Sequence, residues 1–210
     1  MYIPKPFDEP RIDVMQALIR DYPLATLVTL SADGLNANHI PLHLVVDGGS
    51  PFGTLRGHVV RSNPMWGDFD QQTEILTVFQ AANAYISPSR YVTKQQTGKV
   101  VPTWNYAAVH AYGTMRVIDD AAWIRNQLET LTAEHEAAFP KPWAVSDAPH
   151  DFTEKLIEQI IGIEITVTRL SGKWKVSQNQ PAENQIGVIN GLNECGKVEA
   201  AALIKTCQKP

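Results

Sequence analysis

The sequence has few of the features that mark secreted, membrane-spanning or disulfide-rich proteins. Only two of its 210 residues are cysteines, Cys195 and Cys207, so we predict neither a disulfide framework nor a Cys-x-x-Cys metal or redox motif. Charged residues or proline interrupt every apolar stretch before the roughly 18 residues that a bilayer-spanning helix needs. Residues 1–13 carry three prolines and several charges where an export signal needs an apolar run. We therefore expect a cytoplasmic protein without a membrane partner.

An excess of positive charge is also missing. The chain has 18 lysines and arginines against 22 aspartates and glutamates, a net charge of −4. Dedicated nucleic-acid binders usually concentrate basic residues on one face. Asp151, Glu154 and Glu158 outnumber Lys155 in the helix predicted from 151 to 161, so it does not resemble a DNA-recognition helix. Composition argues against DNA as the main partner.

The common catalytic signatures are missing as well. The sequence contains no glycine-rich dinucleotide motif, phosphate loop, nucleophile elbow or His-Glu-x-x-His motif. His39 and His43 would hold a metal only if a third ligand converged on them, and a histidine in an apolar strand is usually a hydrogen-bonded core residue, so no metal site is predicted. We assign no catalytic residue from the sequence.

What is present is the composition of one ordinary compact domain. Hydrophobic residues make up 44% and charged residues 19% of the chain, which is typical of soluble proteins. We interpret residues 1–210 as a single domain, with a helical excursion at about 119–162.

Short alternating apolar segments separated by turns predict a mostly antiparallel sheet. The predicted strands are 24–30, 35–46, 52–59, 75–79, 103–117, 163–170 and 173–178, with a tight turn at Ser171–Gly172. Six or seven consecutive hairpin-linked strands favour a small barrel over an open sheet with exposed edges. The predicted fold class is α+β, with helices flanking this barrel.

Helical periodicity predicts four helices beside the sheet. The first is capped by Asp8 and ends before Pro23, and the second covers about 120–135. The third opens near Asp151, ends at Gly162, and is expected to bury Phe152, Leu156, Ile157, Ile160 and Ile161. The last covers about 196–206.

Three segments concentrate side chains that suit ligand binding. Arg61, Ser62 and Asn63 follow a strand and precede a predicted helical turn, an arrangement that favours phosphate. The alternative is that Ser62 and Asn63 only cap the turn, with Arg61 in solvent.

The other two segments combine aromatic and polar residues. Thr103-Trp104-Asn105-Tyr106 suits a flat aromatic ligand, or alternatively plugs one end of the barrel. Residues 173–178 place Lys173 and Lys175 on one face of a strand, where they meet an anion or only solvent.

Taken together, several segments resemble one known family. They are residues 1–7, 58–66, 85–88, 101–106, 147–149 and 172–179. In this order they strongly resemble the PaiB family of FMN-binding negative transcriptional regulators. The resemblance implies a split β-barrel related to pyridoxamine-phosphate oxidase and flavin reductases. It also implies a homodimer with flavin sites at the subunit interface.

The resemblance further implies which residues bind the flavin. The residues that match the phosphate site are His58, Arg61, Ser62 and Asn63. The ring is expected along the strand Asn38, His39, Ile40, Pro41 and Leu42. The residues expected to close the pocket, from the same or the second subunit, are Thr103, Trp104, Asn105, Trp174, Lys175 and Gln178. Lys94, Lys99 or Lys175 is expected to add positive charge near the phosphate.

Several functions stay open at this point. The family implies an FMN-binding regulator with a DNA or protein partner. The main alternative is an FMN-dependent oxidoreductase, such as a flavin reductase or a pyridoxamine-phosphate-oxidase-like enzyme. Haem binding or degradation would need an axial histidine, for which His39, His58 and His110 are available. An interaction module without any cofactor is the remaining alternative.

Overall fold

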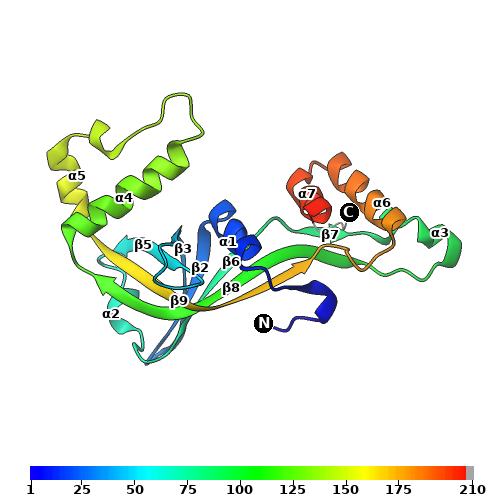
Figure 1. Cartoon of the computed structure of the whole chain (residues 1–210), viewed down its shortest axis with the longest axis horizontal. Coiled ribbons are helices and arrows are strands. Elements are labelled where there is room, and N and C mark those ends of the chain that lie inside the picture. The colour runs from blue at the N-terminus through cyan, green and yellow to red at the C-terminus, as the bar shows by residue number, and fades with distance from the viewer. Residues whose placement is uncertain (207–210) are drawn as a thin grey trace. The chain divides into compact units, whose positions relative to one another are not determined.

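The computed structural model of this chain describes residues 1–206, and Cys207 lies outside the described residues. Figure 1 shows the ribbon of the chain, whose contacts divide it into two compact units. Unit 1 comprises Met1–Tyr22, Phe79–His110 and the chain from Ser171, and unit 2 comprises Pro23–Val78 and Ala111–Leu170. Strands β8 (Thr103–Ile118) and β9 (Ile160–Lys175) contribute residues to both units. The interpretation of the chain as a single domain stays a prediction.

Unit 2 contains most of the sheet. Its strands are β2 (Leu24–Ser31), β3 (Gly34–Pro41), β4 (His43–Val45), β5 (Thr54–Val60) and parts of β6 (Ile75–Gln80), β8 and β9. They are hydrogen-bonded in the order β3-β2-β6-β8-β9-β5-β4. The pairs β2–β3, β2–β6, β4–β5 and β5–β9 are antiparallel. The predicted mostly antiparallel sheet is confirmed. The number of strands differs from the six or seven predicted, because β1 and β7 join off this path and bring the described residues to nine strands.

The predicted β2–β3 hairpin is also confirmed. Its register runs from Leu24 opposite Pro41 to Ser31 opposite Gly34, whose φ of 109° at the turn favours glycine. The second strand ends at Pro41 rather than at Val46. Proline has no N–H to continue the ladder, and the Leu42 N–H donates to the Pro23 carbonyl at 2.9 Å. The chain after Leu42 then forms β4, which pairs with β5.

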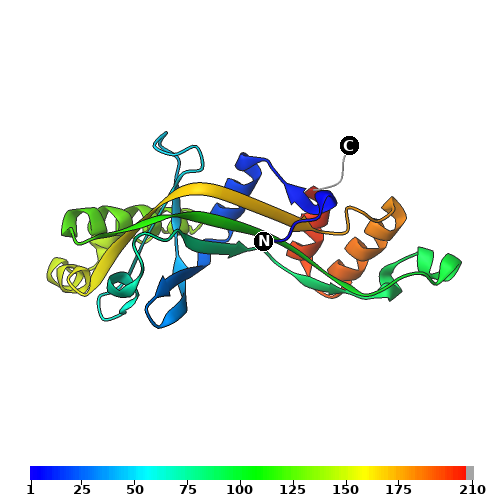
Figure 2. The same ribbon diagram turned by 90° about the horizontal axis from the view of Figure 1, so that it is seen from below.

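Helices α4 (Ala121–Glu136) and α5 (His150–Ile157) lie side by side in unit 2 (Figure 2). With the short helix η3 (Val145–Asp147) they fall in the predicted helical excursion, while α2 (Met65–Asp68) lies outside it. The predicted start of α4 is confirmed, because the Asp120 carboxylate accepts the Trp123 N–H at 2.8 Å.

The prediction of a helix continuing to Gly162 is wrong. Helix α5 ends at Ile157, and β9 begins at Ile160 and pairs with β5. Gly162 lies within this strand, where a Cβ atom would come within 2.5 Å of the Trp123 ring. Phe152 and Leu156, which we expected to be buried, are 57% and 45% exposed. The β-branched residues after Ile157 therefore belong to the sheet.

Unit 1 places helices around the other parts of β8 and β9. Its elements are η1 (Lys5–Phe7), β1 (Asp8–Glu9), α1 (Ile12–Asp21), β7 (Ala84–Ile86), η2 (Pro88–Arg90), α3 (Thr93–Thr97), α6 (Ala182–Glu194) and α7 (Val198–Thr206). Strand β7 pairs antiparallel with the start of β8, and α6 packs against α7 (Figure 1).

Two predictions in unit 1 are wrong for one shared reason. Asp8 does not cap α1, and Ser171–Gly172 is not a turn, because β1 pairs with β9 in this region. Glu9 lies opposite Gly172, where a Cβ atom would approach the Glu9 carbonyl oxygen to 2.9 Å. Position 172 of β9 therefore requires glycine, because the backbone of β1 approaches it too closely for a side chain.

Helix α6 was not expected from the sequence, whereas α7 confirms the last predicted helix. Gly187 and Gly191 lower the helix propensity of the α6 segment. Both glycines face Arg90 of η2, and a Cβ atom at either position would come within 2.4 Å of that residue. Packing against Arg90 therefore explains why α6 contains two glycines, although glycine is unfavourable within a helix.

Each unit buries its own apolar side chains. Leu55, Ile161, Ile163 and Ile165 of β5 and β9 are almost fully buried in unit 2. Ile19, Phe79, Ile86 and Ile204 are almost fully buried in unit 1. Within residues 1–206, no helix is long and apolar enough to cross a membrane.

The cap of α4 predicts a measurable loss of stability. Replacing Asp120 by Ala removes the acceptor of the Trp123 N–H, so we expect the free energy of unfolding to fall by about 1 kcal/mol. Urea unfolding followed by circular dichroism measures it. Asn126→Ala, at an exposed position of the same helix, serves as the control and should be neutral or slightly stabilising. Equal effects of both substitutions would contradict the assigned cap.

Candidate functional site

Two of the predicted flavin segments meet in unit 2. The Asn63 side-chain N–H donates to the Asn38 side-chain oxygen at 2.9 Å, which joins the 61–64 loop to β3. Strand β3 stands at the end of the strand order and pairs only with β2 among the described strands. His39 and Pro41 are exposed, whereas Ile40 and Leu42 are buried. The exposed positions and the strand edge are therefore the parts open to a ligand.

The loop donors are largely engaged within the protein. The Asn63 side-chain oxygen accepts the Met65 N–H at 3.0 Å, at the start of a helix of only four residues. This capping contact is the alternative that the sequence left open for Asn63. Ser62 is exposed. Phosphate binding by Ser62 and Asn63 stays a prediction.

Arg61 is paired with a carboxylate. Its guanidinium donates to both Asp119 carboxylate oxygens at 2.9 and 2.7 Å, and to the carbonyl oxygens of Glu158 and Ile160. This hydrogen bonding raises the pKa of Arg61 and lowers the pKa of Asp119. An anion that binds Arg61 would have to share it with Asp119 or displace Asp119.

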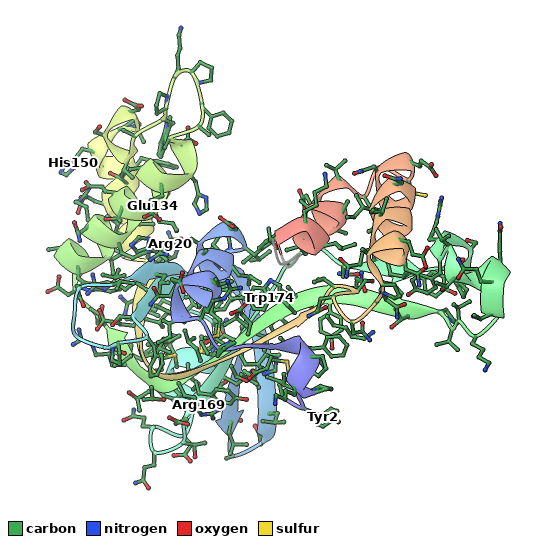
Figure 3. All side chains as sticks on the ribbon, turned by 45° about the vertical axis from the view of Figure 1, so that its right-hand side comes forward. Tyr2, Arg20, Glu134, His150, Arg169 and Trp174 are labelled. Carbon is green, nitrogen blue, oxygen red and sulfur yellow. The ribbon has the colours of Figure 1, made fainter. Side chains whose placement is uncertain are left out.

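Helix α4 supplies partners to two histidines of the sheet. His58 Nδ1 lies 2.9 Å from the Gln127 side-chain oxygen, and His43 Nδ1 lies 2.6 Å from the Glu134 carboxylate, which is labelled in Figure 3. Gln127 is 4% exposed, and its side-chain nitrogen has no hydrogen-bond partner within residues 1–206. His58 is thus oriented by α4 rather than directed freely to solvent.

A cavity of about 300 Å³ adjoins this cluster in unit 2. It is lined by Thr29, Ser31, Asp33, Gly34, Leu35, Asn36, Ala37, Pro64, Met65, Asp68 and Phe69. Asn36 and Ala37 precede Asn38 in β3, and Pro64 follows Asn63. The carboxylates of Asp33 and Asp68 would repel a phosphate. The cavity therefore suits an uncharged part of a ligand.

Unit 1 brings together three other predicted residues. Lys175 Nζ donates to the Thr103 hydroxyl and, at 2.7 Å, to the Trp104 carbonyl oxygen. A cavity of about 170 Å³ is lined by these Thr103 and Lys175 side chains together with Asn105 and Ser177. Burial lowers the pKa of Lys175. The cavity thus combines a partly desolvated ammonium group with neutral polar groups.

A buried pair of polar side chains lines this cavity, and only one of the two, Asn105, was predicted from the sequence. Asn105 and Ser177 are 2% and 4% exposed, and the Asn105 side-chain N–H donates to the Ser177 hydroxyl at 2.9 Å. Ser177 has a φ of 64°, which is a strained conformation for a residue other than glycine. The sequence carried no signal of this strain, because serine does not mark positive φ.

The remaining predicted pocket residues lie elsewhere in unit 1. Trp174 is 5% exposed, and Gln178 donates to the backbone carbonyl oxygens of Trp174 and Pro6. Trp104 is 54% exposed and packs edge-to-face with Tyr85, with ring centroids 6.0 Å apart. Trp174 and Gln178 therefore support the structure locally. The predicted role of the six residues in closing a flavin pocket stays a prediction.

Candidate metal and haem ligands are not gathered in one place. No group of three or more His, Cys, Asp or Glu side chains suits a metal ion in the described part of the chain. His39 is exposed, and His58 is hydrogen-bonded to Gln127. Burial lowers the pKa of His110, which favours the neutral imidazole.

Comparisons with known proteins point to one family and one fold. A family model described as "Putative FMN-binding domain" matches residues 1–169. An uncharacterized protein of Emericella nidulans is 37% identical over 93% of this chain and 92% of its own length. The protease synthase and sporulation protein PAI 2 of Bacillus subtilis is 29% identical over 91% of this chain and 89% of its own length.

Solved structures give the same fold at much lower sequence identity. The flavocytochrome Anf3 from Azotobacter vinelandii has a TM-score of 0.56 at 13% identity, covering 80% of this chain and 69% of that chain. This similarity concerns the fold alone. The predicted α+β split barrel and the predicted family resemblance are both confirmed.

The positive φ of Ser177 predicts that two small substitutions at this position differ in stability. Ser177→Ala removes the hydrogen bond to Asn105 and leaves a buried amide unpaired, so we expect a loss of about 1–3 kcal/mol in the free energy of unfolding. Ser177→Gly loses the same hydrogen bond but relieves the positive φ, so it should be more stable than the Ala variant by about 1 kcal/mol. Urea denaturation of both variants tests this order, and a less stable Gly variant would contradict the strain.

Proposed function

Because the chain belongs to the family described as "Putative FMN-binding domain", we propose that it binds FMN on unit 2, between β3 and the 61–64 loop. The observation that carries this placement is the Asn63–Asn38 hydrogen bond. It holds the loop against the edge strand, so that the two segments form one surface. The surface adjoins the cavity of about 300 Å³.

The edge of β3 suits the ring of the flavin. Alternate backbone N–H and C=O groups of an edge strand point away from the sheet, and they match the donors and acceptors of the pyrimidine part of the ring. Exposed His39 and Pro41 lie in this stretch. When bound, FMN would supply the hydride or electron chemistry, while the chain holds and orients the ring.

The phosphate is assigned to the loop side of the same surface. Ser62 is exposed there, and Arg61 supplies the guanidinium of the loop itself. A phosphate group carries close to two negative charges at neutral pH and would compete with Asp119 for Arg61. His58 lies at the end of β5, which leads into this loop.

A homodimer is part of this proposal. Leu35 of the edge strand β3 is 80% exposed. An edge strand with exposed apolar side chains is normally covered in a functional protein. A second copy of the chain that covers β3 would close the flavin site, as the family resemblance implies.

A regulatory use of the flavin is favoured over catalysis. The resemblance to PaiB-type negative transcriptional regulators and the similarity to PAI 2 support it. A protein partner fits the net charge of −4 better than direct contact with DNA. FMN-dependent oxidoreduction is the first alternative. Haem binding is the second, and an absorption spectrum of the protein mixed with haem would reveal it.

The phosphate assignment predicts different responses to FMN and riboflavin. Arg61→Gln should weaken FMN binding about tenfold and leave riboflavin binding unchanged, since riboflavin has no phosphate. Asp119→Asn should tighten FMN binding about threefold, because it removes the competing carboxylate. Titrations followed by flavin absorbance and fluorescence give both dissociation constants.

Arg116→Gln is the matched control for this experiment. Arg116 is also paired with a carboxylate of unit 2, that of Glu164, but it lies on β8. Its replacement should leave the ratio of the FMN and riboflavin constants unchanged. FMN binding that does not respond to Arg61→Gln would move the phosphate elsewhere, and absence of flavin binding to the wild type would refute the proposed function.

The regulatory role predicts little turnover. With FMN bound, the protein should oxidise NADH or NADPH no faster than the same concentration of free FMN. Absorbance at the nicotinamide band measures this rate with and without protein. Sustained turnover well above that of free FMN would identify the protein as an oxidoreductase instead.

A further inference from the structure

Unit 1 contains a second and larger cavity that the proposed flavin site does not use. Its volume is about 440 Å³, which is within the range of small-molecule sites. Tyr85 and Trp104 form an aromatic wall, with their rings edge-to-face at 6.0 Å. Val188 and Leu192 of α6 add apolar surface. These side chains offer ring faces and hydrocarbon to a flat apolar ligand.

Arg90 is fixed at the border of this cavity. A Cβ atom at Gly187 would meet the Arg90 carbonyl oxygen at 2.2 Å, and one at Gly191 would meet the Arg90 side chain at 2.4 Å. Arg90 also donates to the Glu194 carboxylate at 2.7 Å and to Cys195 Sγ at 3.4 Å. The two glycines of α6 therefore allow the arginine to lie directly on the helix, where Glu194 and Cys195 orient its guanidinium.

Lys197 gives the cavity a net positive charge. Glu194 balances the charge of Arg90, whereas no acidic side chain within residues 1–206 pairs with Lys197, which also lines the cavity. An ammonium group beside aromatic and aliphatic surface attracts an anion that carries its own apolar part. A simple inorganic anion would leave the aromatic wall unused.

We propose that this cavity binds a planar aromatic carboxylate. The ring of the ligand packs against Trp104 and Tyr85, and its carboxylate accepts hydrogen bonds from Lys197 beside the fixed guanidinium of Arg90. All lining residues belong to unit 1. The assignment does not depend on where FMN binds.

Isothermal titration of the full-length protein with 2-naphthoate tests the proposal, with the neutral 2-naphthamide and the aliphatic anion hexanoate as comparison ligands. We expect 2-naphthoate to bind at least about tenfold more tightly than either, because only it combines ring and charge. Lys197→Gln should remove most of the preference for the carboxylate. Trp104→Leu should weaken the binding of 2-naphthoate about threefold to tenfold, while 2-naphthoate should still bind more tightly than the neutral 2-naphthamide.

Lys205→Gln is the matched control, since Lys205 is an exposed lysine of α7 that does not line the cavity. This substitution should leave the affinities for 2-naphthoate, 2-naphthamide and hexanoate unchanged. The proposal is overturned if 2-naphthoate does not bind, if the naphthamide binds equally well, or if Lys197→Gln behaves as Lys205→Gln does. A titration with FMN present separates this site from the flavin site: unchanged 2-naphthoate binding supports a separate site, and competition assigns the cavity to the flavin instead.

Discussion

The antiparallel pairing of β9 is the interaction on which most of the structure depends. In unit 2 it pairs with β5 from Thr166 opposite Thr54 to Ile160 opposite Val60, and in unit 1 it pairs with β1. The β5 pairing buries Glu164, which accepts from Arg56 at 2.7 Å and from Arg116 at 2.7 Å. A buried carboxylate needs such partners, because an unpaired charge in the core is strongly unfavourable. The pairing therefore determines where β5 ends and where the 61–64 loop begins.

Polar residues that suggest ligand binding in the sequence mostly hold the protein together in the structure. Arg61 joins its loop to Asp119, Asn63 joins it to β3, and Lys175 joins β9 to the start of β8. These contacts orient the side chains before any ligand binds, which reduces the entropy lost on binding. They also mean that a ligand must compete with them. Flavin affinity should therefore depend on the internal partners as much as on the residues that touch the cofactor.

The errors in the predicted fold share a physical cause. Ser171–Gly172 was interpreted as a turn, and Gly162 as a helix end, because glycine most often marks such breaks. In the structure both glycines lie within β9, where neighbouring groups leave no room for a Cβ atom. Helix α6 was missed for a similar reason, since Gly187 and Gly191 make room for Arg90. Close approach between segments distant in sequence cannot be recognised from local pattern.

The sequence by itself determined the antiparallel α+β class, the β2–β3 hairpin, the extent of α4, and the family, because periodicity and ordered motifs are local properties. The family resemblance also named Thr103, Asn105 and Lys175 among six candidate pocket residues, and the structure brings these three together at one small cavity. Only the tertiary structure decided that Arg61 faces Asp119, that Asn63 reaches Asn38, that Ser177 is strained, and that Trp104 lines a cavity with Arg90 and Lys197. These relations join residues far apart in the chain, and strand pairing and helix packing alone bring them within reach.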